Sequence, residues 1–380
     1  MNIKFLDLAK EYQDLKTELD SAIFKTLKNS SFVGGKNVED FEVNFANFLG
    51  ARGCVGVGNG TDALEIALRA LNLPKDSEII LPANSFIASI EAVLNSGYKA
   101  VLVDCADDFL IDTDCIKNAL TSKTTAILPV HLYGRACNMQ KILDIAHENH
   151  LKIIEDCAQA HGAKSIINEK LRNVGHIGDI GCFSFYPGKN LGAYGDAGAI
   201  SSNDIELLEK CRSIANHGVN TKDRYNHRLL GRNSRLDGIQ AAILDVKLKY
   251  LSTSNQHRRY IAHLYTQKLS EIPYIITPPS PLYEDHCVWH LYTIMIPSTS
   301  EKRNQLQEYL QNNGISTGIH YPKSLSQIKA IYENPNCILH PSPKAEQYAQ
   351  STLSLPIGNH IEEKEVDYIC KVIERFCETN

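Results

Sequence analysis

Residues 183–200 read FSFYPGKNLGAYGDAGAI and place a strand pattern directly before a glycine-rich turn. The stretch opens with apolar and aromatic residues typical of a buried strand and then enters a glycine-rich turn. Lys189 stands in that turn, directly after the strand. Because ligands gather at the carboxyl ends of strands in α/β sheets, Lys189 is expected beside a binding site. Three interpretations of this lysine are open: a phosphate-loop residue, an ordinary surface lysine, or an amine that reacts covalently.

The phosphate-loop interpretation fails on the letters of the motif. A Walker loop requires GxxxxGK[ST], but Asn190 follows the lysine and Phe183 occupies the position of the first glycine. A lysine that is partly desolvated at a strand end has a lowered pKa and becomes a nucleophile toward carbonyl groups. The position of Lys189 therefore favours covalent chemistry over a surface role.

Around this stretch, from about residue 52 to residue 203, short apolar runs alternate with amphipathic ones. The predicted strands are CVGV, EIILPA, KAVLVDC, TAILPVHLYG, LKIIEDCA, GCFSFYP and GAISS. Between several of them lie helical patterns such as DALEIALRAL and MQKILDIAHENH. Strands that alternate with helices predict a mostly parallel sheet covered on both faces.

The chain beyond residue 235 has a different pattern. RLDGIQAAILDVKLKYL predicts one long helix that continues past STSNQHRRYIAHLY and bridges to a second domain. CVWHLYTIMIP predicts a strand, with His286 and His290 of HCVWH expected at its start, and SEKRNQLQEYLQNNG predicts a helix closed by Gly314. EEKEVDYICKVIERF predicts a final helix. We expect a large domain over 1–250 and a smaller α+β domain over 251–380.

Composition narrows the class of protein. The 380 residues suffice for two domains, and 43% hydrophobic and 22% charged residues are close to the averages of soluble globular proteins. A net charge of -5 without a basic patch argues against binding to nucleic acid or to an anionic membrane. With neither a secretory leader nor a long apolar run, the protein is expected in the cytoplasm.

The cysteine and histidine patterns argue against a metal site. The eleven cysteines form no CxxC pair, and the sequence has no HExxH motif. In a reducing compartment the cysteines are expected to be free thiols, most of them buried.

A second stretch, GVGNGTDALEIAL at 56–68, resembles a dinucleotide fingerprint but does not meet it, because Thr61 replaces the last glycine of GxGxxG. The glycine turn still enters a helix at Gly60, Thr61 and Asp62. Free backbone N–H groups at such a helix start bind anions. The alternative is a plain helix cap.

A third stretch, IIEDCAQAHGA at 153–163, carries Asp156 to the same sheet edge, with Gln159 soon after. A buried carboxylate needs a hydrogen-bond donor or a positive charge as its partner. That partner is either a ligand or a group of the protein itself, such as an arginine or a backbone cap. PANSFIASI brings Phe86 to this edge, where its ring either contacts a ligand or packs in the core. An amine, an anion site, a carboxylate and an aromatic ring are the four groups that pyridoxal phosphate would use.

Nine segments in order make the sequence similar, nearly end to end, to one known family. They are FVGGKNVEDFE, GNGTDALEIAL, PANSFIAS, PVHLYG, IEDCAQAHGA, FSFYPGKNLGAYGDAGAI, NSRLDGIQAAIL, GIHYP and LSLPI. The chain resembles the DegT/DnrJ/EryC1/StrS family of pyridoxal-phosphate nucleotide-sugar aminotransferases. This resemblance implies the fold-type-I architecture, with a mostly parallel sheet in a large domain and a smaller α+β C-terminal domain.

The resemblance also implies roles for particular residues. Lys189 would hold the cofactor covalently, Asp156 would face its pyridine nitrogen, Gln159 its phenolic oxygen, and Phe86 would stack on its ring. The residues implied at the phosphate are Gly60, Thr61, Asp62, Ser184 and Asn233. In this family the asparagine that matches Asn233 reaches the phosphate from the neighbouring subunit, which implies a homodimer with shared active sites. His320 and Tyr321 would border the sugar.

The substrate is implied by the details of these segments. Gly188, where many members have threonine, together with IEDCAQAHGA and NSRLDGIQAA, looks most like the branch that makes dTDP-3-amino-3,6-dideoxyhexoses from dTDP-3-keto-6-deoxyhexoses, with L-glutamate as amine donor. The product would supply a surface polysaccharide, such as the O-antigen of lipopolysaccharide, or a glycosylated metabolite. Tyr194 stands where leucine or methionine is frequent in the family. The resemblance therefore does not define the contacts of the sugar pocket.

Three other functions compete with this branch. A UDP- or dTDP-4-keto sugar substrate and a non-catalytic regulator that binds pyridoxal phosphate remain the alternatives. A dehydratase of the same family would lack the lysine or carry an iron-sulfur cluster, whereas this chain has Lys189 and no clustered cysteines.

Overall fold

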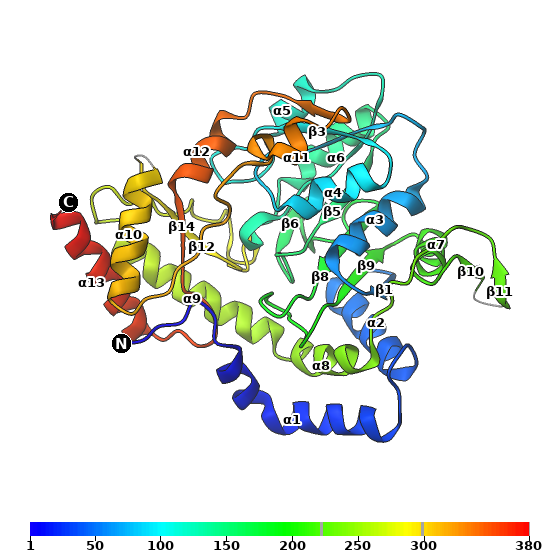
Figure 1. Cartoon of the computed structure of the whole chain (residues 1–380), viewed down its shortest axis with the longest axis horizontal. Helices are drawn as coiled ribbons and strands as arrows, with labels where there is room; N and C mark the ends of the chain where they lie inside the picture. The colour runs from blue at the N-terminus through cyan, green and yellow to red at the C-terminus, as the bar shows by residue number, and fades with distance from the viewer. Residues whose placement is uncertain (221–222, 298–299, 380) are drawn as a thin grey trace.

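The computed structural model describes residues 1–220, 223–297 and 300–379. Its centre is an eight-stranded sheet in the order β1-β9-β8-β5-β4-β2-β3-β13 (Figure 1). The strands are β1 (Gly53–Val57), β2 (Glu78–Pro82), β3 (Lys99–Val103), β4 (Thr124–Ile127), β5 (Lys152–Asp156), β8 (Ile180–Ser184), β9 (Gly198–Ser202) and β13 (Cys337–Leu339). Only β9 pairs antiparallel with its neighbours, so the sheet is mostly parallel, as predicted.

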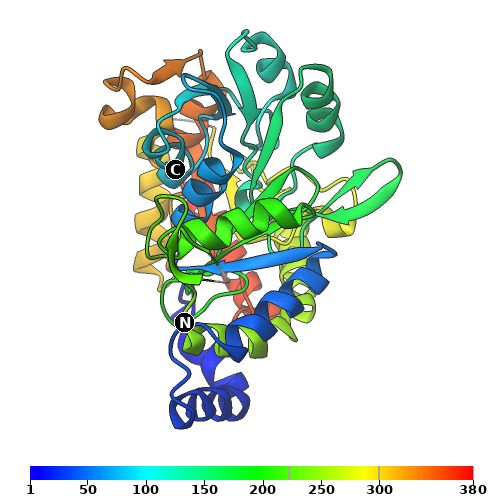
Figure 2. The same ribbon diagram turned by 90° about the vertical axis from the view of Figure 1, so that its right-hand side faces the viewer.

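Helices cover both faces of this sheet. They are α2 (Lys36–Leu49), α3 (Gly60–Leu71), α4 (Ile87–Asn95), α5 (Thr113–Asn118), α6 (Met139–Glu148), α7 (Ile205–Ala215) and α8 (Gly238–Leu248). Figure 2 shows α7 and α2 on opposite sides of β1, and both helices contact that strand. Every residue of β2 is buried, which is typical of a parallel strand covered on two faces.

The strand ends meet at one edge of the sheet. β5 and β8 are parallel and end at Asp156 and Ser184. β1 is antiparallel to β9, which is in turn antiparallel to β8, so β1 runs in the direction of β8 and leads into α3 at the same edge. The predicted convergence of these segments is confirmed.

A second core lies beside the first. Its members come from the two-stranded sheet of β12 (Tyr292–Met295) and β14 (Thr352–Leu355) and from the helices α9 (Leu251–Leu269), α10 (Ser300–Asn312) and α13 (Glu363–Thr379). Ile3 also belongs to it, while β13 pairs with β3 of the large sheet. Segments from both sides of residue 250 therefore contribute to each core, and the division at that residue stays a proposal.

The single long helix predicted after residue 235 is wrong, because the structure has two helices, α8 and α9, with a break at Lys249 and Tyr250. The break lets α8 pack against α1 (Leu8–Lys28) and α2 while α9 packs against α13 (Figure 1). Tertiary packing thus overrides a local sequence that has no helix breaker.

The strand predicted over 287–297 is also shorter than expected. His286 lies in the 3₁₀ helix η2 (Glu284–His286), and His290 lies just before β12. Trp289 adopts a left-handed backbone with φ 48°, and its carbonyl accepts a hydrogen bond from Arg258, so this segment leaves the strand ladder. Gly314 follows α10 with φ 75°, the left-handed conformation expected at a helix end.

The remaining elements are short. They are the hairpins of β6 (Lys164–Ile167) with β7 (Lys170–Asn173) and of β10 (Val219–Asn220) with β11 (Asp223–His227), the 3₁₀ helices η1 (Leu132–Gly134) and η3 (Leu325–Gln327), and the helices α11 (Lys329–Tyr332) and α12 (Pro343–Ser351). All eleven cysteines are free thiols. Among the helices described, none has the length and apolar character needed to cross a membrane.

Candidate active site

A cavity of about 400 Å³ opens where β1, β5 and β8 end. It brings together most of the residues predicted for the site. Those that line it are Gly60, Thr61, Phe86, Asp156, Gln159, Ser184, Lys189 and Tyr321.

Lys189 is held by the turn that follows β8. Its backbone N–H donates a hydrogen bond of 2.8 Å to the carbonyl oxygen of Tyr186. Burial lowers the pKa of its amine to about 8, and the negative charge of Asp156 acts in the opposite direction. Among the described residues, none accepts a hydrogen bond from its Nζ atom. The neutral fraction of this amine near neutral pH is therefore larger than that of an ordinary lysine.

Asp156 ends β5 and is buried. Its carboxylate accepts hydrogen bonds from the Ser89 hydroxyl (2.8 Å) and the Ala158 backbone N–H (3.1 Å). Burial raises the pKa of this carboxyl, and within the described ranges no cation lies close enough to form an ion pair with it. A buried carboxylate that lacks a cation is suited to a ligand that brings a positive charge.

Glu155, the neighbouring carboxylate, points to the other face of the sheet. It accepts hydrogen bonds from the backbone N–H groups of Gly175, Ile177 and Gly178. His131 Nε2 lies 3.2 Å from it. His131, Glu155 and Cys157 are close enough to hold a metal ion, but the hydrogen bonds already made to Glu155 give it a structural role instead.

The start of α3 provides an anion site beside Lys189. Asn59 caps this helix by accepting a hydrogen bond of 2.8 Å from the Asp62 N–H, and the Gly60 and Thr61 N–H groups have no acceptor among the described residues. A Cβ atom on Gly60 would lie 2.6 Å from the Ser184 Cβ, so only glycine lets the helix start approach this hydroxyl. Backbone N–H groups of this kind bind phosphate.

Asp62 does not join the lining of this cavity. Its carboxylate forms an ion pair of 2.7 Å with Arg232, and its backbone N–H is taken by the cap. The structure therefore brings the backbone near Asp62 to the site but directs the side chain elsewhere.

Aromatic and amide groups complete the cavity. Phe86 is 52% exposed, and its ring centroid lies 5.5 Å from that of Tyr321. Gln159 accepts a hydrogen bond from the Tyr133 backbone N–H (2.6 Å) and donates one to the Tyr321 hydroxyl (3.1 Å). Both bonds fix the orientation of the amide.

These groups fit pyridoxal phosphate. The free N–H groups at the start of α3 would take its phosphate, the uncompensated carboxylate of Asp156 would take its ring nitrogen, and the amine of Lys189 would take its aldehyde. Phe86 is positioned at the same cavity for the ring face.

Three further residues lie outside this cavity lining. Asn233 is exposed and forms a backbone bridge with Asn216, so its implied contact with phosphate in a second subunit stays a prediction. His320 lines an adjoining cavity that also contains Lys189. Tyr194 packs under Lys247, whose Nζ lies 4.5 Å from the ring centroid, so this unusual residue belongs to the contact with α1 and lines none of the cavities described here.

Sequence reasoning missed several lining residues. Tyr186, three residues before Lys189, lines both cavities. It could have been predicted, because it lies in the same turn as Lys189. Ser89, which binds Asp156, lies in the quoted segment that contains Phe86. Arg258 and His290 reach the adjoining cavity from distant parts of the chain, and no local pattern points to them.

Comparison with known proteins finds aminotransferases of nucleotide sugars among the relatives of this chain. A transaminase for dTDP-3-amino-3,6-dideoxy-alpha-D-galactopyranose from Aneurinibacillus thermoaerophilus is 41% identical over 98% of this chain and 99% of its own. A UDP-N-acetyl-3-dehydro-alpha-D-glucosamine 3-aminotransferase from Acidithiobacillus ferrooxidans is 39% identical over 98% and 97%. A protein named pleiotropic regulatory protein from Geobacillus stearothermophilus is 39% identical over 99% of both chains.

Solved structures show the same architecture. DesV of S. venezuelae, in complex with a ketimine intermediate, superposes with a TM-score of 0.92 at 37% identity and 99% coverage of both chains. NtdA from Bacillus subtilis, with bound cofactor PMP, superposes with a TM-score of 0.89 at 32% identity, covering 99% of this chain and 85% of its own. The predicted fold type, aminotransferase class and cofactor are confirmed.

Residues 13–374 match the model of the DegT/DnrJ/EryC1/StrS aminotransferase family. This match covers nearly the whole chain, including most of both cores and every residue predicted for the site. The chain therefore belongs to the DegT/DnrJ/EryC1/StrS aminotransferase family.

Proposed function

We propose that this aminotransferase moves the amino group of L-glutamate to the 3-keto group of a dTDP-3-keto-6-deoxyhexose, giving a dTDP-3-amino-3,6-dideoxyhexose. The observation that carries the proposal is the meeting of Lys189 and Asp156 at one cavity whose walls also provide an anion site. Pyridoxal phosphate, when bound, supplies a carbonyl group for amines and a ring that accepts an electron pair.

Lys189 would act as the base and acid of the reaction. Its lowered pKa, about 8, lets the amine both accept and return a proton near neutral pH. The side chain lines both adjoining cavities, so it would lie within reach of a cofactor in one and a substrate in the other.

Asp156 would keep a proton on the ring nitrogen of the cofactor. Its bonds to Ser89 and Ala158 fix the carboxylate, and burial makes the attraction between this negative charge and a protonated nitrogen strong. Gln159, fixed by Tyr133 and Tyr321, would orient the phenolic oxygen in the same way.

The 3-keto substrate is supported by two relatives whose names specify 3-amino or 3-dehydro sugars. They differ in the nucleotide, dTDP in one and UDP in the other, so the position of the carbonyl is the shared element. The finer choice of dTDP and a 6-deoxyhexose follows the relative with 41% identity and the resemblance of the lysine turn. A 4-keto substrate is the alternative.

A regulator is the second candidate, because one relative with 39% identity is named a regulatory protein. The lysine, the carboxylate and the helix start of the cavity are all retained here, which favours catalysis. A regulator that binds the cofactor would not convert it with glutamate.

The proposed homodimer rests on the exposure of Asn233 and of the nearby apolar side chains of Leu229 and Leu230, which are 46% and 89% exposed. Exposed apolar side chains of this kind are typical of interfaces. In such a dimer Asn233 would complete the phosphate site of the neighbouring subunit.

An isotope experiment tests the proposed substrate. Protein loaded with pyridoxal phosphate is incubated with ¹⁵N-glutamate and, in separate reactions, with a dTDP-3-keto-6-deoxyhexose, a UDP-3-keto sugar and a dTDP-4-keto sugar. Mass spectrometry then identifies the labelled amino sugar. The proposal expects the fastest labelling from the first substrate, whereas preferential labelling of the 4-keto sugar would overturn the position assigned to the carbonyl.

A further inference from the structure

A second cavity, of about 250 Å³, lies next to the first and shares Lys189, Gln159, Tyr186 and Tyr321 with it. Its other walls come from the N-terminal segment, α9 and the segment that precedes β12. Among its lining residues there is no aspartate or glutamate, whereas Lys189 and Arg258 both carry positive charge into it. A cavity with cations and no acidic group is suited to an anionic ligand.

Arg258, on α9, is only 7% exposed. Its Nη1 atom donates hydrogen bonds to the carbonyl oxygens of Trp289 (3.2 Å), His290 (3.4 Å) and Ile357 (3.2 Å). Its Nε and Nη2 atoms have no acceptor within the part of the chain that the structure describes, yet they keep access to solvent. Two nitrogens of a fixed guanidinium that lines this cavity thus remain without an acceptor among the residues described.

Arg258 also lacks an acidic partner. No carboxylate in the described ranges lies within ion-pair distance of it. Burial lowers the pKa of the guanidinium to about 10, so it remains protonated at neutral pH. A buried positive charge without a counter-ion is costly, and a bound anion would remove that cost.

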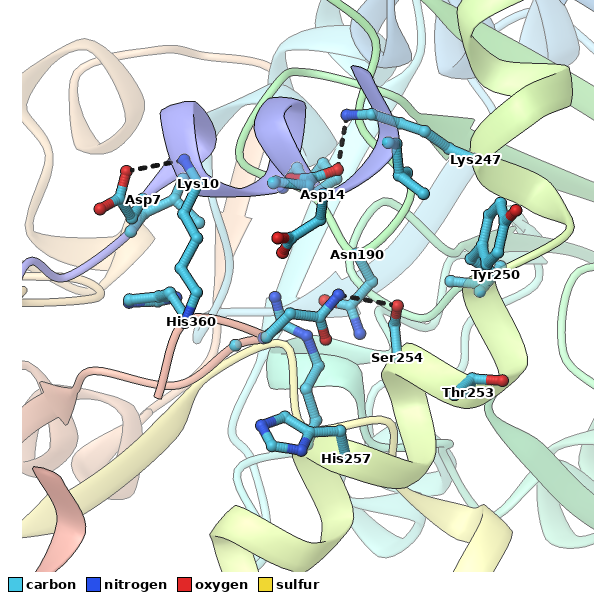
Figure 3. Close-up of a pocket in the computed structure, with 18 residues that line it drawn as sticks. Asp7, Lys10, Asp14, Asn190, Lys247, Tyr250, Thr253, Ser254, His257 and His360 are labelled. Atoms are coloured by element: carbon cyan, nitrogen blue, oxygen red, sulfur yellow. Dashed lines mark hydrogen bonds and ion pairs between the residues drawn. The ribbon is translucent and has the colours of Figure 1, made fainter. Parts of the chain in front are cut away.

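The cavity on the other side of Lys189 provides the contrast (Figure 3). It measures about 350 Å³ and shares Lys189 and Arg258, but Asp7, Glu11 and Asp14 line it as well. Its buried Lys247 is paired with Glu11 at 2.6 Å. Acidic groups thus accompany the cations of that cavity, whereas none of the described residues that line the smaller one is acidic.

We propose that Arg258 binds a carboxylate of the amine donor in the 250 Å³ cavity and thereby directs the donor's amino group toward Lys189. The inference rests on the proposed aminotransferase function and names the residue that selects acidic donors. A guanidinium presents two parallel N–H groups that match the two oxygens of a carboxylate, and this match is stronger than that of an ammonium group. The available Nε and Nη2 atoms of Arg258 form such a pair.

Three variants test the role of Arg258. Arg258→Met removes the charge at similar length, and Arg258→Lys keeps the charge but loses the paired N–H groups. Lys10→Met is the matched control, because Lys10 lines only the cavity of Figure 3 and is partly exposed. Each protein is compared in thermal unfolding, in calorimetric titration with glutarate, and in the two half-reactions, one with glutamate and one with the keto sugar.

The expected result is selective. Arg258→Met weakens glutarate binding and raises the glutamate KM by about 100-fold, because it removes a charged hydrogen-bond partner from a buried site, and Arg258→Lys gives a smaller loss. The keto-sugar half-reaction of amine-loaded protein changes by less than about threefold, and Lys10→Met resembles the wild type in every measurement.

Two results would overturn the inference. Unchanged glutarate binding in a folded Arg258→Met or Arg258→Lys protein would mean that Arg258 does not bind the donor's carboxylate. An equal loss in both half-reactions would give Arg258 a purely structural role in holding the carbonyls it binds. Failure of the wild type to react with glutamate, while it reacts with another donor, would instead overturn the donor in the proposed function.

Discussion

At the scale of single residues, the proposed chemistry depends on Lys189 and Asp156. The sequence predicted both because each follows an apolar strand whose end must lie at the ligand edge of the sheet. The residues that surround them were harder to predict from the sequence. Ser89 binds Asp156 from another helix, and Arg258 reaches the cavity through tertiary packing that no local pattern encodes.

The first prediction concerns Lys189. Replacing it with alanine removes the group that would transfer the proton, so the rate of amino transfer from glutamate should fall by about 10³-fold or more. Cofactor should still bind, because the phosphate site and Asp156 are unchanged. Turnover is measured by formation of the amino sugar, and cofactor binding by equilibrium dialysis. Near-normal turnover in Lys189→Ala would remove the lysine from the mechanism.

The second prediction is a pH dependence. A neutral amine attacks carbonyls and an ammonium does not, so condensation of cofactor-free protein with pyridoxal phosphate should accelerate as pH rises through about 8, the pKa of Lys189. Asp156 raises that pKa through its negative charge. Asp156→Asn should therefore move the midpoint to lower pH, while slowing amino transfer. Stopped-flow absorbance measures the midpoint, and a shift to higher pH in this variant would contradict the assigned electrostatics.

At the scale of elements, the start of α3 illustrates what sequence can and cannot show. The glycine turn before a helix predicted an anion site, and the structure places its free N–H groups at the cavity. The side chain of Asp62 turns to Arg232, a partner more than 150 residues away that the local sequence does not reveal. The break between α8 and α9 was missed for a similar reason, since packing against α1 and α13 decides it.

The third prediction tests the close approach of α3 to β8. Gly60→Ala puts a Cβ atom 2.6 Å from the Ser184 Cβ, so it should destabilise the protein by about 1–3 kcal/mol and weaken cofactor binding. Adding Ser184→Gly makes room for the methyl group and should recover part of the stability without restoring the phosphate contact. Thermal unfolding and cofactor titration separate the two effects. If Gly60→Ala alone leaves both unchanged, the helix start is not tightly packed against Ser184.

At the scale of the whole molecule, the sequence predicted a mostly parallel sheet and a second α+β core, and both are present. It did not predict that β13 would add to the large sheet or that Ile3 would join the small core. Such pairings join residues far apart in sequence, whereas hydrophobic periodicity reports only on local structure.

The fourth prediction tests a shared site between two subunits. If Asn233 completes the neighbouring subunit's phosphate site, Lys189→Ala and Asn233→Ala proteins should each be impaired. Mixed dimers refolded from both would contain one site with two defects and one intact site. Recovery of activity on mixing, measured as amino-sugar formation, is the expected result. No recovery, with mixed dimers demonstrated by mass, would mean that each subunit builds its site alone.

Amino transfer is tested most simply by the absorbance of the bound cofactor through a complete cycle. Glutamate should convert the aldehyde form to the amine form, and a dTDP-3-keto-6-deoxyhexose added after removal of glutamate should restore the aldehyde form. Lys189→Ala should do neither at a measurable rate. If wild-type protein binds pyridoxal phosphate but neither glutamate nor any other amine donor changes its spectrum, the central claim of amino transfer at the cavity of Lys189 and Asp156 is contradicted.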